Sequence, residues 1–187
     1  MSKVPKLFMI LLGCTPKGRN TEQHDVFFGI AEELMQLIPQ MKLFWPEAKG
    51  KIHIDAWREV TVVNNFSIEI TSRTENSTSE NNLYFMNLGG YKQGDFEEYH
   101  YKMLAVAPKL ATAIKLSKKT AFYKHCGYKE APSHIDDKFG IDVDDSHKVD
   151  DLLNAAMKSN YRLKITPLEA PKAEDELHIG YLKLKKS

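Results

Sequence analysis

Apolar and polar residues alternate in short blocks along this chain, and the same series of blocks occurs twice in the same order. A short apolar block bounded by glycine, typical of a buried strand, covers residues 6–12 and recurs at 83–88. A glycine-containing polar loop follows each block. A second extended segment then covers 22–31 in the first series and 98–107 in the second. The pattern predicts one strand–loop–strand unit written twice.

The two series align without a gap when the chain is displaced by 76 residues, as Gly13 and Gly89 illustrate. The aligned pairs of this block include Leu12 with Leu88, Gly18 with Gly94, Glu22 with Glu98 and His24 with His100. Two later blocks resume the match after a short insertion. They align 53–55 with 134–136, Val60 and Val62 with Ile141 and Val143, and 65–71 with 160–166.

The remaining elements follow from the same patterns. Helices are predicted over 32–43 and 109–124, where small and apolar residues form one stripe. Residues 52–63 are extended, and Asn64–Asn65 makes a turn into an alternating strand over 66–70. The second copy carries an extra helix within 144–159. A last strand over 177–184 resembles the opening strand, and we expect it to complete the sheet of the second copy.

These elements predict an α+β fold of two tandem ββαββ-type repeats, made mainly of antiparallel sheet with helices. The first repeat covers 1–76, and the second covers 77–187 with the extra helix and the C-terminal strand. A unit of roughly 75 residues is marginal as an independent core. We therefore expect the two repeats to pack as one pseudo-symmetric body.

Histidines with acidic neighbours recur at aligned positions and form the main candidate site. The set is Glu22, His24, His53 and Asp55 in the first copy, and Glu98, His100, His134 and Asp136 in the second. Two imidazoles with a carboxylate suit zinc, iron or manganese, and the same groups serve as general acid and base without a metal. If the second and third strands of a unit are neighbours, these side chains meet at one end. The alternative, which the sequence favours over a divalent metal, is that they make buried hydrogen bonds that fix the loops.

The loop after the first strand offers a weaker candidate, an anion site formed by Lys17 and Arg19. A plain hairpin loop is the simpler interpretation, since the loop lacks the residue order of a phosphate-binding loop. The aromatic residues that follow each helix, Phe44 and Trp45 in the first copy, are predicted to anchor the core. Cys14 and Cys126 are interpreted as reduced, unreactive thiols.

A formal net charge of +1 gives no bulk support for nucleic-acid binding. No run of residues approaches the roughly 18 apolar residues of a membrane span, so we expect no membrane partner. These features predict a cytoplasmic protein and leave a homo-oligomer open. The competing interpretation is a lipoprotein anchored at Cys14, but the apolar run before it is shorter than the roughly 7–15 residues of a signal peptide.

The motifs at 12–25, 53–58 and 133–140 resemble the bacterial family described as domain of unknown function 1543, whose members carry one or two copies of the domain. The resemblance covers most of the chain up to about Asn154 and implies no activity. Two hypotheses follow from the sequence. The chain is a non-catalytic binding or structural module, or it is a metal-dependent or acid–base enzyme that uses the repeated His, Glu and Asp residues.

Overall fold

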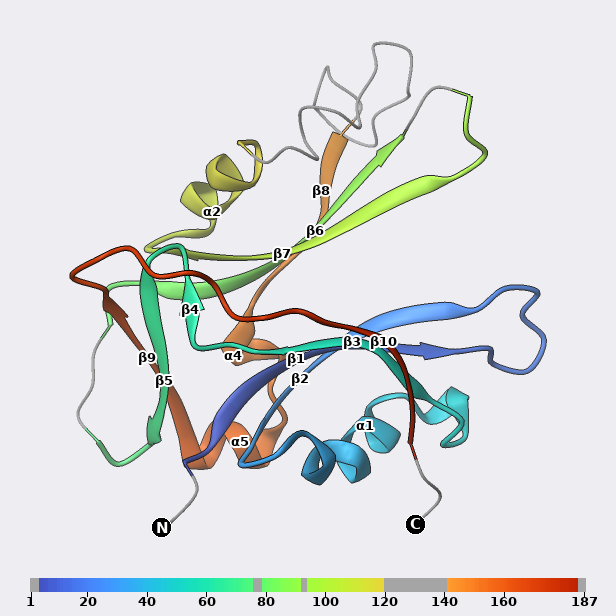
Figure 1. The fold of residues 1–187 in the computed structure, drawn as a ribbon, viewed down its shortest axis with the longest axis horizontal. Coiled ribbons are helices and arrows are strands. Elements are labelled where there is room, and N and C mark those ends of the chain that lie inside the picture. Colours follow the sequence, from blue (N-terminus) through green and yellow to red (C-terminus); the bar gives the residue numbers. More distant parts are fainter. Residues whose placement is uncertain (1–3, 76–78, 92–93, 120–140, 185–187) are drawn as a thin grey trace. The chain divides into compact units, whose positions relative to one another are not determined.

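The computed structural model describes residues 4–75, 79–91, 94–119 and 141–184, with no account of the side chains of 141–144 (Figure 1). The chain divides into two compact units. The first unit comprises Met1–Thr78 and Leu152–Ser187, and the second comprises Ser79–Asp151. Antiparallel sheets dominate both units and helices are few, which confirms the predicted α+β class. None of the helices in the described residues is long and apolar enough to cross a membrane.

The larger sheet of the first unit has four antiparallel strands in the order β10-β3-β1-β2. Their bounds are Lys6–Cys14 for β1, Gln23–Ala31 for β2, His53–Glu59 for β3 and His178–Lys183 for β10. Phe8, Ile10 and Leu12 of β1 are fully buried. These three residues share one face of the strand, whereas Met9 and Leu11 on the other face are partly buried. The apolar block that opens the sequence is an inner strand of the sheet, between β3 and β2.

The segment after β2 is helical but is not the single predicted helix. It consists of the 3₁₀ helix η1 (Leu34–Leu37), the α-helix α1 (Ile38–Phe44) and the 3₁₀ helix η2 (Pro46–Ala48). Glu33 and Gln36 close the start of η1 with a capping box. Pro39 lies in the first turn of α1, where its missing N–H costs no hydrogen bond, so α1 starts there as a separate helix.

A second, three-stranded sheet of the first unit has the order β4-β5-β9. Its strands are β4 (Val62–Val63), β5 (Phe66–Ser72) and β9 (Tyr161–Pro167). Asn64 and Asn65 adopt φ angles of 50° and 64°, the left-handed pair that a two-residue hairpin turn needs. The predicted turn is confirmed. β9 pairs antiparallel with β5 so that Glu69 lies opposite Lys164.

The second unit contains a sheet of order β7-β6-β8 and the helix α2. The bounds are Asn82–Tyr91 for β6, Glu98–Ala107 for β7, Ile141–Lys148 for β8 and Leu110–Ser117 for α2. Ala113 of α2 packs into a core with Met86 and Ala105. Of the helix predicted over 109–124, residues from 120 onward lie outside the described part. The predicted extra helix is two short ones, α4 (Val149–Leu152) and α5 (Ala155–Asn160).

Strand pairing in the second unit repeats that in the first. Gly13 lies opposite His24, and Gly89 lies opposite His100. The pairing of β1 with β3 shifts register between Leu11 and Leu12, and that of β6 with β8 shifts between Asn87 and Leu88. These are the positions that the displacement by 76 residues matches, so the aligned residues of the first block occupy equivalent backbone positions.

Two expectations about strand pairing were also wrong. The C-terminal strand β10 pairs with β3 of the first unit and does not complete the sheet of the second. The alignment of Val60 and Val62 with Ile141 and Val143 also fails. Leu12 and Leu88 are equivalent positions, and the residues opposite them are Ile54 and Val143, so Val143 corresponds to Ile54. Strand β8 is therefore the counterpart of β3.

Asp175, in the segment between β9 and β10, ties the C-terminal part of the chain to the connection between β3 and β4. Its carboxylate accepts hydrogen bonds from the Thr61 hydroxyl, the Thr61 N–H at 2.7 Å and the Val62 N–H at 2.9 Å, and lies 3.5 Å from Arg58. Burial alone raises the pKa of Asp175, but these hydrogen bonds and the Arg58 charge outweigh it and hold the pKa below the ordinary value.

We expect Asp175→Ala to lower the free energy of unfolding by about 1–3 kcal/mol near neutral pH, because it leaves the Thr61 and Val62 N–H groups unpaired. The folded-state pKa is depressed, so the contribution of the carboxylate is complete above the ordinary Asp pKa of about 3.9 and declines as the pH falls through the folded-state value. Chemical denaturation at several pH values measures this. The exposed neighbour Glu176→Ala is the control, and a constant difference between Asp175→Ala and wild type down to the acid limit would contradict the assignment.

Candidate functional site

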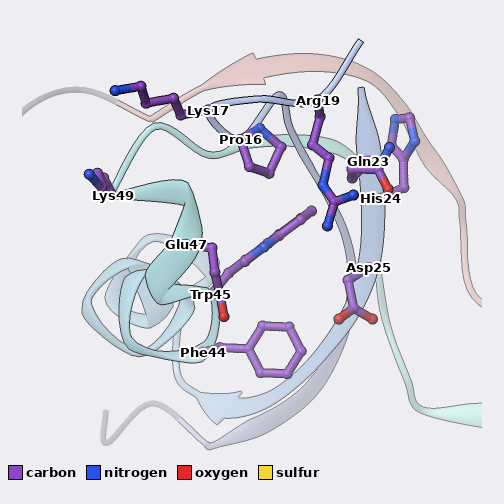
Figure 2. Close-up of a pocket in the computed structure, with 10 residues that line it drawn as sticks. All are labelled: Pro16, Lys17, Arg19, Gln23, His24, Asp25, Phe44, Trp45, Glu47 and Lys49. Atoms are coloured by element: carbon purple, nitrogen blue, oxygen red, sulfur yellow. The ribbon is translucent and has the colours of Figure 1, made fainter. Parts of the chain in front are cut away.

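A pocket of about 710 Å³ lies beside the loop that joins β1 to β2 (Figure 2). This volume is within the range of about 300–1,000 Å³ found for small-molecule sites. The loop, the start of β2 and the segment around the end of α1 form its wall. The lining residues are Pro16, Lys17, Arg19, Gln23, His24, Asp25, Phe44, Trp45, Glu47 and Lys49. Both residues of the predicted anion site are among them.

The sequence suggested that the aromatic residues of this wall anchor the core, and this prediction was wrong. Phe44 is 42% exposed, although its ring contacts that of Phe27 at a centroid distance of 5.4 Å. Trp45 is only half-buried, and its indole extends along the pocket (Figure 2). Because α1 ends at Phe44, these two rings project from the end of the helix and line the pocket. Their position directly after the helix was visible in the sequence, but an aromatic pair there is equally compatible with the core.

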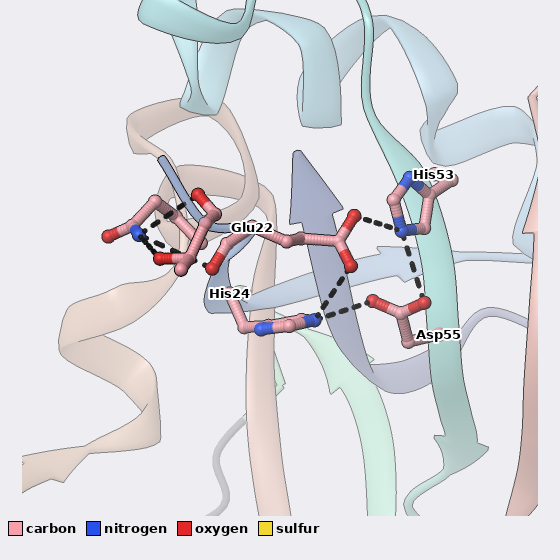
Figure 3. A network of polar contacts seen from close by, with 6 residues as sticks. Glu22, His24, His53 and Asp55 are labelled. Atoms are coloured by element: carbon pink, nitrogen blue, oxygen red, sulfur yellow. Dashed lines mark hydrogen bonds and ion pairs between the residues drawn. The ribbon is translucent and has the colours of Figure 1, made fainter. Parts of the chain in front are cut away.

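His24 belongs both to this pocket and to a cluster of four polar side chains, which we call the His–carboxylate cluster: Glu22, His24, His53 and Asp55 (Figure 3). Nε2 of His53 lies 3.1 Å from Glu22 Oε1 and 3.1 Å from Asp55 Oδ1. Nε2 of His24 lies 3.3 Å from Asp55 Oδ2 and 3.7 Å from Glu22 Oε2. Each carboxylate therefore faces both imidazoles, one oxygen to each. The four residues predicted for the first copy are brought together.

The strand order that brings them together differs from the expected one. Strands β2 and β3 are not neighbours, since β1 lies between them. Gly13 of β1 lies opposite His24 on one side and His53 on the other. A Cβ atom at Gly13 would overlap His53 Nε2 and Asp55 Oδ2. The cluster therefore occupies the space above a residue that has no side chain.

Burial differs across the cluster. Only 10% of the His53 side chain is exposed, against 41% of His24. The Tyr181 ring of β10 lies 4.4 Å from the His53 ring and helps to cover it. Nε2 of His53 and Oδ2 of Asp55 are both buried, and neither makes a hydrogen bond within the described residues, although their neighbours are close. A buried polar atom without a hydrogen bond lowers the free energy of unfolding by about 1–3 kcal/mol. The close contacts within the cluster therefore leave these two atoms without the hydrogen bonds that would offset this cost.

The cluster has the donor set of a metal site without being arranged as one. In the described ranges, no group of three or more His, Cys, Asp or Glu side chains surrounds a metal position. The separations of 3.1–3.7 Å are nevertheless close to those between ligands of one ion. Two atoms bound to zinc at about 2.0–2.1 Å in a tetrahedral site lie about 3.3–3.4 Å apart.

Only part of the second predicted set can be placed. Glu98 Oε2 lies 3.9 Å from His100 Nε2, much as Glu22 lies near His24. His134 and Asp136 are outside the described residues. The backbone position opposite Gly89, equivalent to that of His53 opposite Gly13, belongs to Asp142.

Cys14 is not a candidate nucleophile. It ends β1, and only 2% of its surface is exposed. Burial raises the pKa of its thiol, and the Glu22 carboxylate raises it further, which outweighs the opposite effect of Lys51. The thiol therefore stays protonated near neutral pH, as expected of an unreactive cysteine.

Comparison with known proteins confirms the family resemblance for part of the chain. Residues 19–70, which contain the whole His–carboxylate cluster, match the model of the family described as Domain of Unknown Function (DUF1543). The fold is similar to the crystal structure of a protein, Il1583, from Idiomarina loihiensis, with a TM-score of 0.64 and 24% sequence identity over 98% of this chain and 99% of that one. None of the curated proteins matches the sequence. These likenesses support the fold and the family match and assign no activity.

Replacing Gly13 with alanine tests whether the cluster depends on this glycine. We expect the added methyl group to displace His53 and Asp55 and to lower the free energy of unfolding by about 1–3 kcal/mol, as overpacking does. Chemical denaturation measures the stability, and the imidazole NMR resonances of His53 and His24 report the displacement. His100 of the second unit is the internal control. Unchanged His53 and His24 resonances in Gly13→Ala would contradict the geometry.

Proposed function

We propose that the chain is a binding module whose His–carboxylate cluster takes up one divalent transition-metal ion. The observation that carries the proposal is Nε2 of His53, which is buried, makes no hydrogen bond within the described residues and faces both carboxylates. A metal ion would accept the lone pair of this nitrogen and bind the carboxylate oxygens that surround it. The glycine beneath the cluster provides the room that such an arrangement needs.

The donor chemistry narrows the choice of ion. Imidazole nitrogens together with carboxylate oxygens suit zinc, iron and manganese, whereas calcium and magnesium prefer an all-oxygen set. With neutral imidazoles the two carboxylates carry a charge of about −2, which a divalent cation balances. Binding is the part of the function that this geometry supports, because no reacting group is identified.

We also propose that the two units arose by duplication of one ancestral unit within a bacterial cytoplasmic protein. The repeated strand order, the matched Gly13–His24 and Gly89–His100 pairs and the register shifts at equivalent positions support the duplication. The family resemblance supports the bacterial origin, and the buried, protonated Cys14 is compatible with a reducing compartment.

Metal binding is tested on protein without a histidine tag, stripped with a chelator and then equilibrated with Zn²⁺, Fe²⁺ or Mn²⁺. We expect one ion per chain by elemental analysis. His53→Ala and His24→Ala each remove a ligand. Titration calorimetry should show a loss of affinity larger than the roughly 10–100-fold that removal of an outer-shell partner costs.

The control is His178→Ala, which removes a histidine of the same unit whose ring stacks on Trp57 and which is not among the four cluster residues. It should bind the ion like the wild type. Glu22→Gln keeps the shape of a half-exposed side chain, so it tests the ligand role with little risk to folding. The proposal fails if the wild type retains no ion, or if His53→Ala and Glu22→Gln both bind as tightly as His178→Ala.

A further inference from the structure

The pocket beside the His–carboxylate cluster carries positive charges that the proposed metal does not use. Lys17 and Arg19 come from the loop between β1 and β2, and Lys49 follows η2. None of these three side chains is in an ion pair within the described residues. Arg19 points into the pocket, whereas the Lys17 amine extends away from it (Figure 2). An arginine without a carboxylate partner attracts an anionic group and binds it with two parallel hydrogen bonds.

Aromatic surface lies next to these charges. Phe44 is 42% exposed, and the Trp45 indole and Arg19 both line the pocket, into which Arg19 points (Figure 2). Small-molecule sites combine aromatic walls with a few polar groups that fix the orientation of the ligand. Two partly exposed rings beside an arginine therefore suit a ligand with a flat ring, held by stacking, and a charged substituent, held by the guanidinium.

Two carboxylates in the same wall limit the charge of that ligand. Asp25 and Glu47 reduce the net charge of the lining to about +1, with His24 neutral. A polyanion such as nucleic acid would meet repulsion from these groups. A small anion that reaches Arg19 only would not.

We propose that this pocket binds a small organic anion that carries an aromatic ring. Arg19 holds the anionic group, and Trp45 and Phe44 hold the ring. The inference goes beyond the proposed metal binding, since the two sites share only His24. It also gives Arg19 a role that a plain hairpin loop lacks.

Phenyl phosphate is a suitable probe, with inorganic phosphate and phenol as probes that lack the ring or the charge. The chain has two tryptophans, so Trp57→Phe leaves Trp45 as the only one and as a reporter in the pocket. With chelator present, we expect phenyl phosphate to change the Trp45 fluorescence saturably, with a Kd below about 1 mM. Inorganic phosphate and phenol should each bind at least about tenfold more weakly, since each loses one of the two kinds of contact.

Arg19→Gln should weaken phenyl phosphate binding about tenfold or more, as loss of a charge-assisted hydrogen bond does. Arg73→Gln, an exposed arginine of the same unit outside the pocket, is the matched control and should leave binding unchanged. Calorimetry on chains with both tryptophans gives a second readout that does not depend on Trp57→Phe. Absence of saturable binding, or equal affinities for Arg19→Gln and Arg73→Gln, would overturn the proposal. Because chelator is present throughout, the result is separate from that of the metal titration.

Discussion

The missing side chain at Gly13 is the constraint on which the candidate site depends. Strands on either side of a third lie roughly 9–10 Å apart, too far for most polar side chains on them to meet above the strand between. Here the intervening position is a glycine, so His24 and His53 lean over it from opposite sides and share two carboxylates. Three of the four cluster residues, His24, His53 and Asp55, lie on strands of the sheet, and strands hold a binding site more precisely than loops do.

The exposed fraction of the side chains rises from the buried end of the cluster to the pocket. His53 lies under Tyr181 at the buried end, whereas His24 is half-exposed and faces the pocket. A ligand in the pocket therefore meets the cluster through one imidazole only. The arrangement resembles many small-molecule sites, in which a few polar groups lie at the end of a partly aromatic cavity. The positive loop that carries Arg19 belongs to this unit alone, since Asp95 stands at the aligned position of the other.

Local pattern predicted most of the strands, because a buried strand or an alternating one reads directly from apolar spacing, and the Asn64–Asn65 turn has its own chemistry. The meeting of Glu22, His24, His53 and Asp55 was foreseen for the wrong strand order. Strand order and partner choice are decided by distant packing: β10 is largely exposed and so carries no face pattern that points to β3. The alignment of 53–55 with 134–136 rested on a matching triplet and was wrong. The strand register, with its bulge after Leu11, shows that β8 is the counterpart of β3.

The pairing of β9 and β10 with strands of the first unit has a consequence for biosynthesis. The whole of the second unit lies between the N-terminal strands and the partners that complete their sheets. A ribosome therefore releases every residue of the second unit before β5 and β3 can acquire their last neighbours. Until then, one edge of each nascent sheet stays open, and an open edge invites pairing with other chains. Because of this order of translation, the second unit is complete, and free to fold, before the sheets of the first unit acquire β9 and β10.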